Sequence, residues 1–302
     1  MDEPSINPEL LMASGDATIR HLYRRTATFV DTCDQRYGKN ADWKIFSGTF
    51  VRIAQRLFVA TVSHSIDNLE NPSRFVLTTK NGHSHPNGST IVLNTFATDH
   101  DRPDVGLIEL DAELFQSFDG LESIGLDRIS LLPPERHLSS LMGTPSETVK
   151  IHPMENGQWG VGGTLSGFTT SAIDHSKWPR LNLQQPMSQE IDLLVRYPND
   201  SPDIRDDTGM QSELPNPHGV SGGGLWTHDD CQNGLWLPDN CKLVGIQSSW
   251  LKDVELVRLT KISFWLDLVY SNYPDLRDVI DELDGYSFSG SKLARQFDSP
   301  EP

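Results

Sequence analysis

Between about Trp43 and Thr260, short apolar or alternating segments recur along the chain, and Gly, Pro, Asn and Asp separate them. The segments are rich in Val, Ile, Leu, Thr and Phe, as in RLFVATV, STIVLNTF, DVGLIEL and KLVGIQSSW. Many short strands with turn residues between them are typical of a β-sandwich or a β-barrel. No alternation of strands with long helices is present, so the pattern disfavours a parallel α/β sheet.

The segment before this region has a helical pattern instead. Asp16 is a suitable N-cap for a helix that begins directly after it. The side chains that would share one face of that helix are Ile19, Leu22, Tyr23, Thr26 and Val30. We therefore expect residues 1–40 to form a polar leader and a short amphipathic helix.

The pattern becomes helical again after Thr260. Five side chains of KISFWLDLVYSNY lie at helical spacing, namely Ile262, Trp265, Leu266, Val269 and Tyr270. Pro274 ends this helix and suits the first position of the next one. We expect C-terminal helices over residues 261–284 that pack on the β domain, and a flexible tail over residues 285–302.

The charge and the ends of the chain narrow the classes of partner. The formal net charge of -17 arises from 42 acidic and 25 basic residues among 302. Such a surface repels phosphate backbones and anionic lipid, so we expect neither nucleic acid nor a membrane as a partner. No apolar stretch has the length of a bilayer, and the first residues lack the features of a secretory signal. These features lead us to expect a cytoplasmic protein.

The strongest chemical signal is the segment from Pro217 to Trp226, in which Ser221 stands between Gly219 and Gly222. A nucleophilic serine needs an exposed hydroxyl and nearby backbone N–H groups that face the developing oxyanion. Glycines permit the unusual backbone path of such a loop, because they lack a Cβ atom. Taken alone, the segment also fits a glycine-rich turn with an incidental serine.

Five matches, in order along the chain, resemble the chymotrypsin-like serine proteases, and the chain looks nearer to their bacterial trypsin-like branch. Ser47-Gly48-Thr49-Phe50-Val51 is followed by Leu57-Phe58-Val59-Ala60-Thr61-Val62-Ser63-His64, a β-run that ends in histidine. Asp104 then precedes the apolar run Val105-Gly106-Leu107-Ile108-Glu109-Leu110, and the Ser221 segment comes next. The fourth match is Lys242-Leu243-Val244-Gly245-Ile246-Gln247-Ser248-Ser249-Trp250. The fifth is Leu259–Trp265, which is similar to the closing strand and C-terminal helix of the family.

The resemblance implies an all-β fold of two six-stranded antiparallel β-barrels of the chymotrypsin type. The double-barrel domain would span residues 41–260, with a first barrel at about 41–140 and a second at about 145–260. A short N-terminal helix and a C-terminal helix would accompany the barrels.

The resemblance also implies a mechanism. His64, Asp104 and Ser221 would form the catalytic triad of a serine endopeptidase, in the chain order His, Asp, Ser. The backbone N–H groups of Gly219 and Ser221 would form the oxyanion hole. No metal or cofactor would be needed, and the partner would be a protein or peptide substrate.

Several further residues would meet the substrate. Pro215 stands where trypsins carry the aspartate that binds Arg and Lys, which favours a small or apolar P1 side chain. His218 adjoins the oxyanion glycine, and Ser249 and Trp250 would flank the substrate. The Ser248 hydroxyl would support the triad aspartate.

The sequence also departs from the animal digestive members of the family. Val220 stands where they have an aspartate that pairs with a new N-terminus after cleavage, so activation by that route is not expected. The long polar stretch from Arg196 to Pro217 suggests either a regulatory loop or an ordinary surface loop.

Because a cytoplasmic endopeptidase must spare its host, we expect narrow or regulated specificity, with a regulatory partner as in stress or phage defence. Two alternatives stay open. One is an inactive pseudoprotease that binds or scaffolds, and the other is an esterase of another fold.

Overall fold

The computed structural model describes most of the core of the chain. The described residues are 8–31, 44–67, 75–77, 92–98, 103–118, 120–132, 134, 138–153, 159–197, 202–204, 211–213, 215–228, 236–288 and 295–296.

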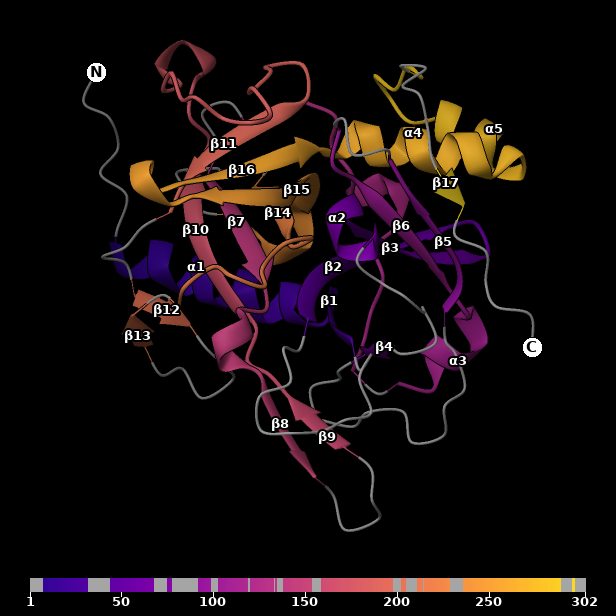
Figure 1. The fold of residues 1–302 in the computed structure, drawn as a ribbon, viewed down its shortest axis with the longest axis horizontal. Coiled ribbons are helices and arrows are strands. Elements are labelled where there is room, and N and C mark those ends of the chain that lie inside the picture. The colour runs from indigo at the N-terminus through magenta and orange to yellow at the C-terminus, as the bar shows by residue number, and fades with distance from the viewer. Residues whose placement is uncertain are drawn as a thin grey trace.

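The first sheet has seven strands in the order β17-β5-β6-β3-β2-β1-β4, and every neighbouring pair is antiparallel. Its strands are β1 (Thr26–Asp31), β2 (Lys44–Ile53), β3 (Arg56–Thr61), β4 (Phe75–Leu77), β5 (Val92–Ala97), β6 (Gly106–Leu110) and β17 (Arg295–Gln296). Arg295 and Gln296, which lie in the expected tail, form β17 and pair with β5. In Figure 1 the strands of this sheet are indigo to purple, apart from β17, which is yellow.

The second sheet has six antiparallel strands in the order β10-β7-β14-β15-β16-β11. They are β7 (Leu138–Gly143), β10 (Ser166–Ser171), β11 (Asp192–Arg196), β14 (Gly224–His228), β15 (Cys241–Leu251) and β16 (Leu256–Lys261). A bridge between Ala172 and Val195 joins the two edge strands, β10 and β11. The N–H of Ile173 also donates to the carbonyl of Leu194 at 2.8 Å, so the six strands close on themselves.

The predicted fold class is confirmed, because two antiparallel sheets dominate and helices lie near each end of the chain. Two small hairpins project from this body (Figure 1), formed by β8 (Lys150–Pro153) with β9 (Trp159–Gly162) and by β12 (Pro202–Ile204) with β13 (Gln211–Glu213). The second hairpin lies within the stretch expected as a regulatory or surface loop. The other residues of that stretch that fall between 198 and 214 lie outside the described residues.

The helices are short, apart from the first and the fourth. The α-helices are α1 (Pro8–Tyr23), α2 (Ser63–Asp67), α3 (Ala112–Gln116), α4 (Ile262–Asn272) and α5 (Arg277–Asp281). The 3₁₀ helices are η2 (Leu126–Arg128), η3 (Ser146–Thr148), η4 (His175–Lys177), η5 (Pro238–Asn240), η6 (Lys252–Val254) and η7 (Pro274–Leu276). Among the described residues, no helix is long and apolar enough to cross a membrane.

The N-terminal helix differs from its prediction at both ends. It begins at Pro8 rather than after Asp16, and it ends at Tyr23. Thr26 and Val30, expected on its apolar face, lie in strand β1, which pairs with β2 on one side and β4 on the other. The β-branched run Thr-Ala-Thr-Phe-Val favours a strand once partner strands are present, so tertiary pairing overrides the helical spacing.

One apolar cluster joins the two sheets to the terminal helices. It contains Leu22 of α1, Phe58 of β3, Trp226 of β14 and Trp265 of α4, all fully buried. The rings of Phe58 and Trp265 meet edge to face at a centroid distance of 6.3 Å. This shared core holds the sheets side by side, with α4 and α5 over the upper part of the first sheet (Figure 1).

A buried carboxylate ties the C-terminal helices to strand β6. Glu109 of β6 is only 3% exposed, and it accepts hydrogen bonds from Arg56 at 2.7 Å and Asn94 at 2.5 Å. The hydroxyl of Tyr273, at the end of α4, donates to the same carboxylate at 2.9 Å. Desolvation and the neighbouring carboxylate both raise the pKa of Tyr273, so its hydroxyl stays a donor.

This network makes Tyr273→Phe a sharp test of the packing. The substitution removes one buried hydrogen bond to a charged group, and we expect a loss of about 1.5–3 kcal/mol in the free energy of unfolding, measured by urea denaturation. Tyr270→Phe is the matched control, because the Tyr270 hydroxyl contacts the exposed Asp281 at 3.3 Å. The control should change stability by less than about 0.5 kcal/mol, and equal losses in the two variants would contradict this assignment.

Candidate active site

His64 is carried by the turn that follows strand β3. Four strand residues before it, Leu57 to Ala60, are fully buried and fix the path of the backbone. The chain then enters α2, so His64 is the second residue of a short helix rather than the last residue of a strand. Its side chain is 46% exposed, which leaves the imidazole open to solvent on one side.

Asp104 lies beside His64 because of the strand pairing. The end of β3 pairs with the start of β6 through Thr61 and Gly106, so the segments that hold the two residues meet at one edge. Thr98 fixes the segment further, since its N–H donates to the carbonyl of Val105 at 3.1 Å. A side chain at Gly106 would meet the carbonyl oxygen of Val62 at 2.8 Å, so this close approach requires glycine.

The Asp104 carboxylate receives three hydrogen bonds. Its Oδ2 lies 2.7 Å from Nδ1 of His64, and its Oδ1 accepts the His64 backbone N–H at 3.2 Å. The hydroxyl of Ser63 donates to Oδ1 at 2.6 Å. Burial alone would raise the pKa of Asp104, but the bonds and charge of His64 and the bond from Ser63 outweigh it and lower that pKa. The carboxylate therefore stays ionised and holds the imidazole by Nδ1.

Ser221 lies in a tight turn that only glycines permit at two positions. Gly219 and Gly222 have φ values of +93° and +88°, in the left-handed region. A Cβ atom on Gly222 would also lie 1.9 Å from the carbonyl oxygen of Ser47 and 2.3 Å from the hydroxyl of Thr61. The turn thus contacts the first sheet at β2 and at the end of β3, three residues before His64.

The turn leaves two backbone N–H groups without an acceptor. The carbonyl of His218 accepts the N–H of Ser146 at 2.7 Å, and the carbonyl of Val220 accepts that of Gly223 at 2.7 Å. In a trans peptide the N–H points opposite to the C=O, so the N–H groups of Gly219 and Ser221 face away from these partners. Within the described part of the chain neither has an acceptor, and neither does the Ser221 hydroxyl have a hydrogen-bond partner.

Among the residues expected to meet the substrate, Pro215 and His218 lie in or just before this turn, while Ser249 and Trp250 follow Gln247, whose carbonyl accepts the Gly222 N–H. Pro215 is buried and its carbonyl accepts the hydroxyl of Tyr197, while His218 is exposed. Ser249 and Trp250 are half-buried on β15, and the ring of Trp250 lies 5.9 Å from that of Tyr197.

Ser248 does not support the aspartate, which corrects the expectation. Its hydroxyl donates to the carbonyl of Arg258 on β16 at 3.2 Å. The pairing of β15 with β16 shifts register between Gln247 and Ser249, so Ser248 lies at this irregularity. The hydroxyl on Asp104 comes from Ser63 instead, where the family motif Thr-Ala-Ala-His has alanine. That departure was the available sequence signal, and it was missed.

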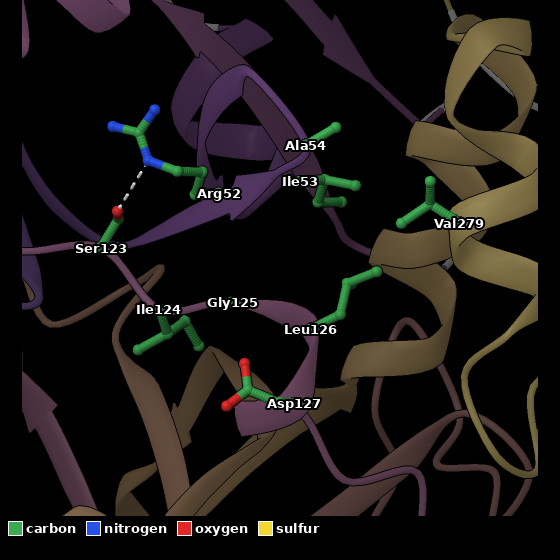
Figure 2. Close-up of a pocket in the computed structure, with 9 residues that line it drawn as sticks. All are labelled: Arg52, Ile53, Ala54, Ser123, Ile124, Gly125, Leu126, Asp127 and Val279. Carbon is green, nitrogen blue, oxygen red and sulfur yellow. Dashed lines mark hydrogen bonds between the residues drawn. The ribbon is translucent and has the colours of Figure 1, made fainter.

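A pocket of about 400 Å³ lies elsewhere, where the β2–β3 turn, residues 123–127 and α5 meet (Figure 2). Ile53, Ile124, Leu126 and Val279 give it an apolar lining. Arg52 at its edge donates to the Ser123 hydroxyl at 3.4 Å. None of the residues expected in catalysis or substrate binding lines this pocket.

No protein-family model matches the chain, and no curated protein does. Among solved structures, it is similar to the scabies mite inactivated protease paralogue S-I1, with 15% identity, a TM-score of 0.47, and coverage of 85% of this chain and 99% of that one. For the scabies mite inactivated protease paralogue S-D1, the identity is 12%, the TM-score 0.46 and the coverages 89% and 97%. For the catalytically active tobacco etch virus protease complexed with product, the identity is 12%, the TM-score 0.41, and the coverages 85% of this chain and 81% of that one.

The contrast between Ser63 and Ser248 gives a direct test. Ser63→Ala removes a hydrogen bond that stabilises the ionised carboxylate, so the pKa of Asp104 should rise. Ser248→Ala is the matched control and should leave that pKa unchanged, because its hydroxyl bonds to Arg258. Titration of the Asp104 carboxyl carbon by NMR measures both. If the pKa of Asp104 rose in Ser248→Ala alone, the expectation that the Ser248 hydroxyl supports the aspartate would be restored.

Proposed function

We propose that this chain is a serine endopeptidase in which Ser221 is the nucleophile, His64 the general base and Asp104 the residue that orients His64. One observation carries the proposal. The His64–Asp104 pair, joined at 2.7 Å, stands at the end of the first sheet against which the Ser221 turn packs. Around Ser221, two backbone N–H groups have no acceptor among the described residues.

The hydrogen bond to Asp104 fixes the useful tautomer of His64. When Nδ1 carries the proton donated to the carboxylate, Nε2 of the neutral imidazole is an acceptor. It can then take the proton of the Ser221 hydroxyl, and the ionised Asp104 stabilises the imidazolium that results. The catalytic hydrogen bond between serine and histidine is often long without substrate, so the unbonded Ser221 hydroxyl is compatible with this role.

The steps follow from these roles. The Ser221 oxygen attacks the scissile carbonyl carbon, while its proton passes to Nε2 of His64. The N–H groups of Gly219 and Ser221 donate to the oxyanion. His64 then protonates the leaving amine, which breaks the C–N bond and leaves an acyl-enzyme. Water then attacks the acyl carbon and gives a proton to His64. The bond between that carbon and the Ser221 oxygen breaks, the proton returns from His64 to Ser221, and the carboxylic acid leaves.

The surroundings of Pro215 support an uncharged P1 side chain. Pro215 brings no charge, and the Tyr197 hydroxyl already donates to its carbonyl. Tyr197 also packs edge to face on Phe168 at a ring-centroid distance of 5.1 Å, so apolar rings dominate this region. We extend the proposal to cleavage after small or apolar residues.

Labelling with a fluorophosphonate probe tests the proposed function. The Ser221 oxygen would displace fluoride from phosphorus as its proton passes to His64. We expect the wild-type chain to be labelled, Ser221→Ala to be unlabelled, and Asp104→Asn to react roughly 10⁴-fold more slowly, because the tautomer of His64 would be wrong. Ser171→Ala, an exposed serine on β10, is the control and should react like the wild type.

Folded wild-type protein that takes up no probe would favour the alternative of an inactive protein that binds or scaffolds. Equal labelling of Ser221→Ala would place the nucleophile elsewhere. Where labelling depends on Ser221, cleavage of a peptide library by the wild type, with loss of cleavage in Ser221→Ala, separates an endopeptidase from an esterase.

A further inference from the structure

Ser47 of β2 is a buried residue through which the first sheet contacts the nucleophile turn. It is 0% exposed. Its backbone N–H donates to the carbonyl of Ser221 at 2.8 Å, and its hydroxyl donates to the carbonyl of Gly219 at 3.2 Å. The hydroxyl also accepts the N–H of Thr144 at 2.8 Å, and the Ser47 carbonyl accepts the hydroxyl of Thr61 at 2.8 Å. These contacts fix the orientation of the Ser47 side chain.

Together with its neighbours, Ser47 provides donors for an unbroken run of carbonyls. The four carbonyls from residue 218 to residue 221 accept, in order, the Ser146 N–H, the Ser47 hydroxyl, the Gly223 N–H and the Ser47 N–H. Each bond fixes the plane of one peptide, and therefore the direction of the N–H in that peptide. The N–H groups proposed to bind the oxyanion belong to this run. The Gly219 N–H shares a peptide with the carbonyl that accepts from Ser146, and the Ser221 N–H shares one with the carbonyl that accepts from Gly223. The two bonds from Ser47 hold the peptides that alternate with these, at the carbonyls of Gly219 and Ser221. Ser47 therefore acts on the direction of the two N–H groups through the neighbouring peptides.

The residue between Gly219 and Ser221 is held by apolar packing rather than by charge. Val220 is 6% exposed, and a Cβ atom on Gly143 of β7 would lie 2.4 Å from its Cγ1. The absence of a side chain at Gly143 therefore leaves room for Val220. The turn needs no ammonium partner at this position, because hydrogen bonds from Ser47 and Ser146 and the packing of Val220 already hold it.

We infer that Ser47 is a positioning residue: it holds the carbonyls of Gly219 and Ser221, which belong to the peptides on either side of the Ser221 N–H, and so keeps the turn in the reactive orientation. The intact chain is therefore reactive without proteolytic release of a new N-terminus. This inference rests on the proposed function and adds to it how the oxyanion site is held.

Ser47→Ala tests this role because it removes the bond to the Gly219 carbonyl and keeps the backbone bond to the Ser221 carbonyl. The fluorophosphonate reaction is followed at several probe concentrations, which separates probe binding (KI) from the reaction step (kinact). A positioning role predicts that kinact falls about tenfold to hundredfold, less than the loss of a whole oxyanion donor, while KI stays within about twofold. Ser47→Thr keeps the hydroxyl and should restore most of kinact.

Ser139→Ala is the matched control. Ser139 is also fully buried in a strand that borders the turn, but its hydroxyl has no hydrogen-bond partner among the described residues. All variants are compared well below their melting temperatures, so that the folded fraction is the same. An unchanged kinact in Ser47→Ala, or an equal fall in Ser139→Ala, would overturn the role of Ser47 and leave the proposed function standing.

A second experiment tests whether the chain reacts without proteolytic activation. Intact wild-type protein, with its mass confirmed, is compared with protein after limited proteolysis. Labelling of the intact chain supports the inference. Labelling only after cleavage would overturn it and spare the proposed function, whereas no labelling in either state would overturn both.

Discussion

The contact between the turn at Gly222 and strand β2 at Ser47 is the constraint on which the candidate site depends. The residues proposed for catalysis come from two sheets, so their relative position is set where the sheets touch. That contact is largely backbone against backbone, because a Cβ atom on Gly222 would lie 1.9 Å from the Ser47 carbonyl oxygen. Backbone contacts of this kind cannot adjust by changing a rotamer. The distance between the two halves of the site is therefore fixed more firmly than side-chain packing alone would allow.

The fold class and the place of the candidate residues were predictable because their signals are local. The apolar runs that end at His64 and begin after Asp104 can be recognised from the sequence, and so can the glycines around Ser221. The start of the chain was less predictable, since helical spacing continued into Thr26–Val30. Only the pairing of β1 with β2 and β4 makes this segment a strand, and those partners lie far away in the sequence.

The hydrogen-bond partners of the site were not predictable for the same reason. Ser248 matches a family position, yet a register shift in β15 places its hydroxyl on the carbonyl of Arg258. The hydroxyl that donates to Asp104 belongs to Ser63 instead, and the hydroxyl that donates to the carbonyl of Gly219 belongs to Ser47 of the first sheet. A short motif specifies a residue type, whereas the partner of a hydroxyl depends on which strands meet and in which register. The glycine-rich turn was thus predictable from the sequence, and the hydrogen bonds that hold it were not.

The division of the site between two sheets also has a consequence for biosynthesis. Strands β1 to β6, with His64 and Asp104, leave the ribosome before the segment that contains Ser221, and the six-stranded sheet is complete only when β16 has emerged. Under the proposed mechanism, a nascent chain therefore holds the base His64 before the segment of the nucleophile Ser221 can dock on β2. The order of translation thus keeps the growing chain from hydrolysing peptide bonds before it is complete. By the same mechanism, a truncated product that lacks the last strands would be inactive.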